Sequence, residues 1–80
     1  MSVRVLYFAA CREPAGTSSE ELDVGGQRVD DVVRAIVEKH PGLSKIAPRC
    51  RVAVNQSFAR GDDVVPDGAE VALVPPVAGG

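Results

Sequence analysis

The order of apolar and polar residues along the chain predicts a small α+β domain. Residues 29–40, VDDVVRAIVEKH, place apolar side chains at i, i+3, i+4, i+7 and i+8, which gives one apolar side to a helix. Other stretches are rich in β-branched and aromatic residues or alternate between polar and apolar types, as strands do. Strands are predicted at residues 3–8, 20–24, 51–55, 58–60 and 70–74.

Proline, glycine and hydroxyl residues mark the connections between these elements. Residues 11–19, CREPAGTSS, are predicted to be a loop, and residues 43–50 to be irregular. Pro66-Asp67-Gly68 predicts a turn, because proline presets φ and glycine accepts a positive φ. The resulting order is β-β-α-β-(β)-β. The most economical arrangement packs the helix on one face of a mixed sheet of four or five strands.

A single helix covers only one face of the sheet, so the other face is expected to stay open. Side chains alternate along a strand, and the Arg4 side of the first strand should be the exposed one. The same alternation places Leu6, Phe8 and Val74 on the open face, with Phe58 beside them. We expect a contiguous apolar patch that docks a partner protein, rather than scattered surface residues.

Composition and charge narrow the class of protein. The chain has 80 residues, 45% of them apolar and 25% charged, which is typical of one folded globular domain. Its net charge of -2 opposes binding to a phosphate backbone, so no nucleic-acid partner is expected. The apolar run near the N-terminus is too short for a signal peptide or a membrane span. We therefore expect a cytoplasmic protein without a membrane partner.

The usual signatures of an active site are missing. His40 is the single histidine and is expected to be a surface residue at a helix end. Cys11 and Cys50 do not have the spacing of a zinc or thioredoxin-like site, and each is expected to be a reduced structural thiol. The pairs Asp30-Asp31 and Asp62-Asp63 are expected to be solvated. No phosphate-binding glycine motif occurs, so an enzyme complete in itself is not predicted.

The C-terminal sequence PPVAGG is the remaining unusual feature. It divides the chain into a domain of residues 1–74 and a flexible tail of residues 75–80. Pro75 and Pro76 favour an extended exit from the last strand, and Gly79 and Gly80 have no side chain to obstruct a narrow channel. Such a tail can deliver its carboxylate into the active site of another protein. A carboxylate must be activated before it reacts, most simply as an acyl-adenylate, so an ATP-using partner is implied.

Several sequence segments together resemble the MoaD/ThiS-type sulfur carrier family, which includes the small subunit of molybdopterin synthase. They are LYFAACRE in the first strand, AVNQ in the third, the helix after Gly-Gly, and above all PDGAEVALVPPVAGG at the end. The resemblance spans nearly the whole chain. It implies a ubiquitin-like β-grasp fold and a role as a sulfur carrier in molybdenum cofactor biosynthesis.

The same resemblance implies roles for the tail and for the open face. Gly80 would be adenylated by an E1-like adenylyltransferase with ATP, then converted to a thiocarboxylate by a sulfurtransferase, with Gly79 as its steric companion. The sulfur would go to cyclic pyranopterin monophosphate in the large synthase subunit, within a heterotetramer. The chain itself would bind no cofactor. The implied partner-binding residues are Leu6, Phe8, Arg12, Phe58, Val74, Pro75, Pro76, Val77 and Ala78.

Two departures from the family pattern and several alternatives stay open at this point. Val74 stands where relatives often have an aromatic residue, and Arg28 precedes the helix in place of a Ser or Thr cap. The same tail chemistry would serve a carrier for cysteine or thiamine biosynthesis. Gly80 could also form isopeptide bonds with lysines, as in a ubiquitin-like modifier. The last alternative is an interaction module with an inert tail.

Overall fold

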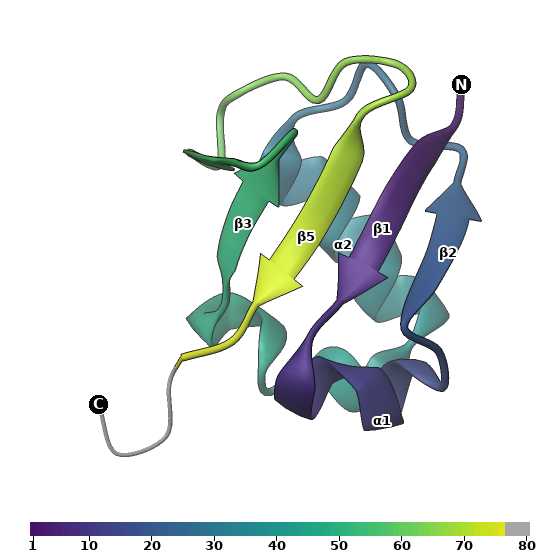
Figure 1. Cartoon of the computed structure of the whole chain (residues 1–80), viewed down its shortest axis with the longest axis vertical. Coiled ribbons are helices and arrows are strands. Elements are labelled where there is room, and N and C mark those ends of the chain that lie inside the picture. The colour runs from purple at the N-terminus through teal and green to yellow at the C-terminus, as the bar shows by residue number, and fades with distance from the viewer. Residues whose placement is uncertain (77–80) are drawn as a thin grey trace.

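The computed structural model describes residues 1–76, and these form one five-stranded mixed sheet covered on one face by the helix α2, Val29–Lys39 (Figure 1). The strand order is β2-β1-β5-β3-β4, with β1 parallel to β5 and the other neighbours antiparallel. The α+β prediction is therefore confirmed. The strands are β1 (Val3–Tyr7), β2 (Ser19–Leu22), β3 (Arg51–Val54), β4 (Ser57–Ala59) and β5 (Glu70–Val74).

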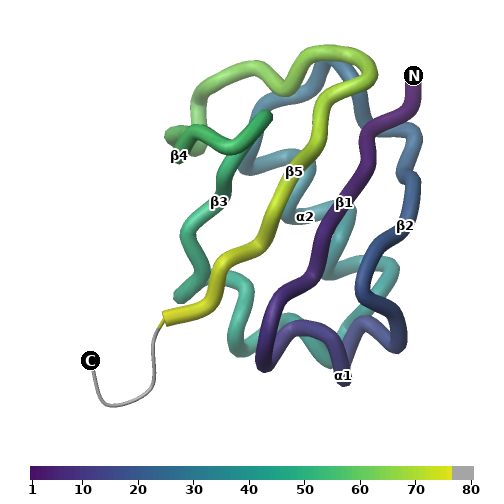
Figure 2. Tube along the Cα trace, in the orientation of Figure 1, coloured from purple at the N-terminus to yellow at the C-terminus, as the bar shows by residue number. Residues whose placement is uncertain are grey.

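The core lies between α2 and the two central strands. β1 and β5 occupy the middle of the sheet, and α2 runs behind them (Figure 2). Val5 and Tyr7 of β1 and Leu73 of β5 are almost completely buried, as are Val32 and Ile36 of α2. Alternation along the strands and the 3.6-residue period of the helix thus bring their apolar sides together, as the sequence predicts.

The N-terminus of α2 is satisfied by the backbone of a distant loop. Arg28 at the N-cap position makes no side-chain capping bond, as its residue type suggests. The amide of Val29 donates instead to the carbonyl of Asp63 at 2.9 Å, and that of Asp30 to the carbonyl of Gly61 at 3.0 Å. These bonds supply partners for two of the amides that a helix leaves free at its start.

Two predicted loops contain short helical segments, which is a correction to the sequence reading. Within and just before the stretch 11–19, a 3₁₀ turn spans Ala9–Cys11 and a single α-helical turn, α1, spans Arg12–Ala15. At the start of the predicted irregular stretch 43–50 and within it, 3₁₀ turns span Pro41–Leu43 and Ala47–Arg49. Segments of three or four residues are too short to show a hydrophobic period, so the sequence pattern does not reveal them.

Among residues 1–76, no helix is both long enough and apolar enough to cross a membrane.

Candidate functional site: the open sheet face

The open face of the sheet carries a continuous apolar row. Strand register places Leu6 opposite Ala72, Ala72 opposite Ala53, and Ala53 opposite Phe58, so the row crosses four strands. None of these residues belongs to the buried core cluster or packs against it. Side chains opposite one another on paired strands lie on the same face, so the four form one surface.

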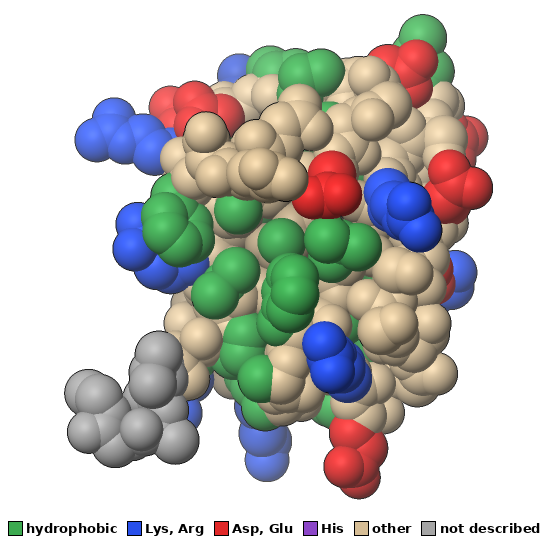
Figure 3. Space-filling view, in the orientation of Figure 1, with side chains coloured by type: hydrophobic (Ala, Val, Ile, Leu, Met, Phe, Trp, Pro, Cys, Tyr) green, Lys and Arg blue, Asp and Glu red, His purple; other side chains and the backbone are tan. Residues whose placement is uncertain are grey.

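Phe8 and Val74 extend this row at one end. Phe8 follows β1 in extended backbone, so its side chain lies on the same face as Leu6, and it is 38% exposed. Val74 is the last residue of β5 and lies on the same face as Ala72. A hydrophobic patch over β1, β5 and β3 is visible in Figure 3, with charged side chains around it. We define the open-face patch as Leu6, Phe8, Ala53, Phe58, Ala72 and Val74.

The β3–β4 hairpin brings Phe58 onto this face. Asn55 and Gln56 have φ values of +50° and +70°, the pair of positive angles found in a two-residue type I′ turn. β4 is therefore Ser57–Ala59, one residue earlier than the predicted 58–60, and Phe58 pairs with Ala53. The side chain of Phe58 is 56% exposed, which is unusual for a large aromatic group in a domain this small.

Arginine side chains lie at the border of the patch. The guanidinium carbon of Arg51 is 3.7 Å from the centre of the Phe58 ring, a cation–π contact. Arg51 is also the strand neighbour of Val74, where β5 ends. On the other side of the face, Arg4 lies opposite Glu70 in the pairing of β1 with β5. Arg51 therefore places a positive charge at the edge of the patch where β5 ends and the tail begins, whereas Arg4 lies at the opposite end of β5 beside Glu70.

Arg12 is fixed at the end of β1. Its Nε donates to the carbonyl of Tyr7 at 3.1 Å, and the rest of its side chain is exposed. This bond holds Arg12 near Phe8, the residue that follows β1. The structure thus places Arg12 next to the patch, and its role in binding a partner stays a prediction.

The tail starts at the edge of the open-face patch. Pro75 is half-buried and Pro76 is exposed, and both follow directly on Val74. Four further predicted site residues, Val77, Ala78, Gly79 and Gly80, lie outside the described residues. Whatever surface binds the patch would therefore meet the beginning of the tail as well.

A second group of polar side chains lies on the helix side of the sheet. Glu20 accepts hydrogen bonds from the Tyr7 hydroxyl at 2.5 Å and from His40 Nε2 at 2.5 Å, and its other oxygen pairs with Lys39 Nζ at 2.7 Å. Burial alone would raise the pKa of Glu20, but the bonds from Lys39, Tyr7 and His40 lower that pKa to about 2. Burial and the bond to Glu20 also raise the pKa of the Tyr7 hydroxyl.

This group corrects the sequence reading of His40 as a plain surface residue. Its side chain is only 15% exposed, because it packs edge-on against the ring of Tyr7 as well as pairing with Glu20. Sequence reasoning missed the group because Glu20 sits in a strand of polar composition, SEEL. The signal that could have found it is the register, which puts Glu20 opposite Val5 on the core side.

The acidic pairs are not gathered into a metal site. Asp63 accepts a hydrogen bond from the Arg60 amide at 2.8 Å, and Asp31 forms an exposed ion pair with Arg34 at 2.9 Å. Within residues 1–76, no three His, Cys, Asp or Glu side chains lie together as a metal would require. Among the described residues, the open-face patch is thus the strongest candidate for function.

Comparison with known proteins identifies the family of the chain. Residues 5–80 match the model of the ThiS family, which is nearly the whole chain. The chain belongs to the ThiS family. The family resemblance inferred from the sequence is therefore confirmed.

Individual relatives of this ThiS-family chain make the relation more specific. It is 43% identical to the molybdopterin synthase sulfur carrier subunit of Mycobacterium tuberculosis, over 100% of this chain and 99% of that protein. The crystal structure of SAMP1 from Haloferax volcanii matches with a TM-score of 0.88 and 32% identity, over 100% of both chains. Subunits 1 and 2 of the molybdopterin-converting factor from Helicobacter pylori form a complex, and one chain of it matches with a TM-score of 0.72 and 26% identity, over 100% of both chains.

The structural matches also bear on the fold. They confirm that this ThiS-family chain has the ubiquitin-like β-grasp fold, in which the helix α2 covers one face of the mixed sheet. The contribution of individual patch and tail residues to partner binding stays a prediction.

Proposed function

We propose that this chain is the sulfur carrier subunit of a molybdopterin synthase. The observation that carries the proposal is the full-length similarity to the M. tuberculosis sulfur carrier subunit at 43% identity. The open-face patch agrees with it, because a carrier must dock on other proteins while its C-terminus reacts. An exposed apolar area on an otherwise compact domain is the usual mark of such a contact.

The chemistry of the carrier would take place at the C-terminal carboxylate of Gly80. An oxygen of that carboxylate attacks the α-phosphate of ATP, pyrophosphate leaves, and an acyl-adenylate forms. Sulfide-level sulfur from a donor then attacks the acyl carbon, AMP leaves with the oxygen that joined it to the acyl group, and the thiocarboxylate forms. That thiocarboxylate delivers its sulfur to cyclic pyranopterin monophosphate, the precursor of molybdopterin. ATP belongs to the activating enzyme, so the carrier requires no cofactor of its own.

The chain contributes position and access to this chemistry. Pro75 and Pro76 fix φ at the base of the tail and donate no backbone hydrogen bond that would pair the tail with the sheet. The four residues beyond them can span up to about 13 Å. Gly79 and Gly80 have no side chain, so they fit a channel too narrow for other residues.

Three partners follow from the proposal. The large synthase subunit would bind the open-face patch, and the H. pylori complex of subunits 1 and 2 supports a partner of this kind. An E1-like adenylyltransferase would supply the adenylate and a sulfurtransferase the sulfur. We place the protein in the cytoplasm, where ATP for the activation step is available, and we expect two carriers and two large subunits to assemble as a heterotetramer.

The test is mass spectrometry of the intact chain after incubation with an E1-like adenylyltransferase, ATP and a sulfur donor. We expect one oxygen to be replaced by sulfur, with the change located on the C-terminal peptide. A variant lacking Gly80 is the matched control and should stay unchanged. If enzymes that charge another ThiS-family carrier leave this chain at its original mass, the proposal is wrong.

Modification of other proteins is a second candidate function. It is favoured by the similarity to SAMP1, a small archaeal modifier protein, at 32% identity. The same acyl-adenylate would then be attacked by the ε-amine of a lysine, giving an isopeptide bond to Gly80. Proteomic digestion would reveal this function as target lysines that carry the C-terminal residues of the chain.

A further inference from the structure

We propose that Cys11 and Cys50 form an oxidative modification site, at which a hydroperoxide converts the two thiols into one intramolecular disulfide. They are the only two cysteines of the chain and lie 39 positions apart in the sequence. The fold nevertheless brings their sulfur atoms to 3.7 Å. Both are free thiols in the structure.

The two thiols come from different elements that meet on the helix side of the sheet. Cys11 ends the 3₁₀ turn after β1 and is completely buried. Cys50 follows the turn Ala47–Arg49, directly before β3, and its Sγ donates weakly to the carbonyl of Ile46 at 3.3 Å. Neither thiol belongs to the open-face patch, so the proposed oxidation site is separate from the candidate docking surface.

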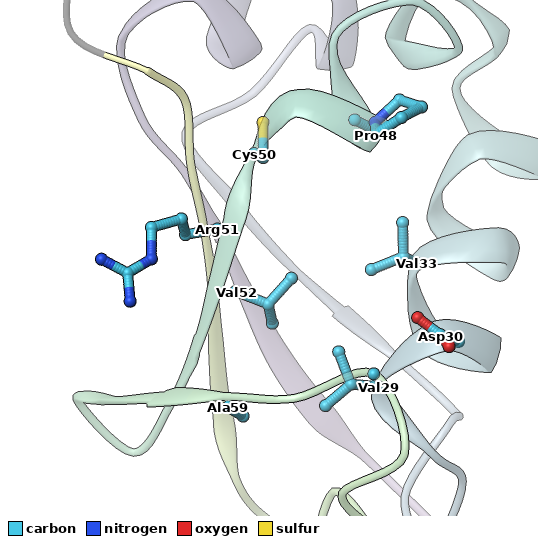
Figure 4. A pocket seen from close by; sticks show the side chains of 10 residues that line it. Val29, Asp30, Val33, Pro48, Cys50, Arg51, Val52 and Ala59 are labelled. Atoms are coloured by element: carbon cyan, nitrogen blue, oxygen red, sulfur yellow. The ribbon is translucent and has the colours of Figure 1, made fainter.

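A pocket gives a small oxidant access to Cys50. Its volume is about 250 Å³, and Cys50 lines it together with residues of α2 and β3. In Figure 4, Val33 of α2 and Val52 of β3 point into this space, while the Arg51 side chain extends to the other side of the strand. Hydrogen peroxide is little larger than water and would fit, so the half-buried Cys50 is the first thiol to react.

The reaction balances with hydrogen peroxide as the only oxidant. The Cys50 thiolate attacks one peroxide oxygen, the O–O bond breaks, and the hydroxide that leaves takes up the thiol proton as water. Cys50 is then a sulfenic acid. The sulfur of Cys11 attacks the Cys50 sulfur, the S–S bond forms, and the sulfenic oxygen leaves as water with the proton from Cys11. Two electrons have passed from the thiols to the peroxide.

The distance between the two sulfur atoms and the pKa of Cys50 determine how fast the disulfide would form. The sulfur atoms need to approach by roughly 1.6 Å to reach the length of a disulfide bond. Burial, together with the hydrogen bond to Cys11, raises the pKa of the Cys50 thiol to about 12, so little thiolate is present at neutral pH. The pair would therefore respond to sustained oxidation rather than to a short pulse.

The disulfide would join two segments that flank the base of the tail. Cys11 immediately precedes Arg12, and Cys50 immediately precedes Arg51, the strand neighbour of Val74. Closing a loop of this length restricts the unfolded chain, so the oxidised protein should unfold at a Tm higher by about 10 °C or more.

The experiment treats the full chain with excess hydrogen peroxide and follows intact mass, thiol alkylation and Tm. We expect a digest to contain one peptide pair that joins Cys11 to Cys50 and is two hydrogens lighter than the two reduced peptides together, and dithiothreitol to restore both the thiols and the lower Tm. The exposed Met1 is counted separately, because peroxide adds an oxygen atom to it. Sulfinic or sulfonic acid on Cys50 as the end product, disulfide-linked dimers, or two thiols that still react with iodoacetamide after unfolding would each overturn the proposal.

Two variants separate the pair from ordinary cysteine oxidation. Cys50→Ser should leave Cys11 reduced after the same treatment, because Cys11 is buried. Cys11→Ala leaves the Cys50 sulfenic acid without a partner, so Cys50 should gain oxygen atoms that the parent chain does not gain. If the parent gains oxygen on Cys50 as fast as Cys11→Ala does, the proposal is wrong. Should Cys11→Ala fail to fold, the comparison of the parent with Cys50→Ser decides the matter.

Discussion

Glu20 is a carboxylate held on the core side of a sheet, where an unpaired charge would be costly. Its side chain is 14% exposed, and its charge is balanced by Lys39 and His40, with the Tyr7 hydroxyl as a further donor. These partners join the end of α2 to β1 and β2. Because they favour the ionised form, the pKa of Glu20 falls to about 2 in the folded protein.

This pKa predicts how stability depends on pH. The ordinary pKa of Glu20 is 4.5 and its folded value is about 2, so its contribution is complete above pH 4.5 and disappears as the pH falls toward 2. We expect a loss of about 2–3 kcal/mol from this group across that window, measured as free energy of unfolding in urea.

The matched variants are Glu20→Gln and Glu21→Gln. Glu20→Gln removes the charge that titrates, so it should be less stable at pH 7 and lose most of the acid-dependent change. Glu21 is the exposed neighbour on the same strand, and Glu21→Gln should keep the pH dependence of the parent chain. Equal pH profiles for the parent and Glu20→Gln would show that other carboxylates govern the acid response.

At the scale of elements, the turn before β5 determines how the central strand enters the sheet. Gly68 has a φ of +79°, and its amide donates to the carbonyl of Ser2 at 2.8 Å, next to the start of β1. The Ala69 amide closes the turn onto the carbonyl of Pro66 at 3.1 Å. The sequence predicts this turn correctly, because proline, aspartate and glycine each favour it for a local reason.

Gly68→Ala tests the turn. A Cβ at this position would meet no atom within 4 Å, so the cost comes from the left-handed backbone alone and should be about 1–2 kcal/mol of stability. Gly68→Asn should cost less, since asparagine tolerates this conformation better than alanine does. Urea denaturation of the three proteins measures both values. Equal midpoints for the alanine and asparagine variants would contradict the assignment of strain.

The bounds of a helix or strand are predicted from the sequence more accurately when its pattern of apolar and polar residues is longer. The bounds of β5 are predicted as observed, and the predicted helix 29–40 differs from α2 only at its last residue. The helical turns within residues 9–15 were missed because they are shorter than any period. The position of Phe58 follows from the turn at Asn55 and Gln56, whose positive φ angles neither residue type requires. The hydrogen-bonded group of Glu20, Tyr7, Lys39 and His40 depends on the register between β1 and β2, which the sequence of one strand does not determine.

At the scale of the whole molecule, one face of the sheet contributes to stability and the other is the candidate surface for binding a partner. The helix side holds the core, the Glu20 group and the two thiols, all of which affect stability. The opposite side holds the open-face patch, which contributes little to the core and ends where the tail begins. A substitution in the patch should therefore change binding while it leaves folding almost unchanged.

Phe58→Asp tests this division of tasks, with Val64→Asp as its matched control. Both side chains are large, apolar and similarly exposed, 56% and 59%, but Val64 lies on the loop between β4 and β5. Phe58→Asp removes the ring that Arg51 contacts and puts a charge into the patch, so affinity for the large synthase subunit should fall about tenfold or more. Val64→Asp should bind as the parent does, and calorimetry measures all three. Because both sites are exposed, the Tm should differ little among the three proteins. If Phe58→Asp binds the large subunit as tightly as Val64→Asp does, Phe58 is not part of the interface.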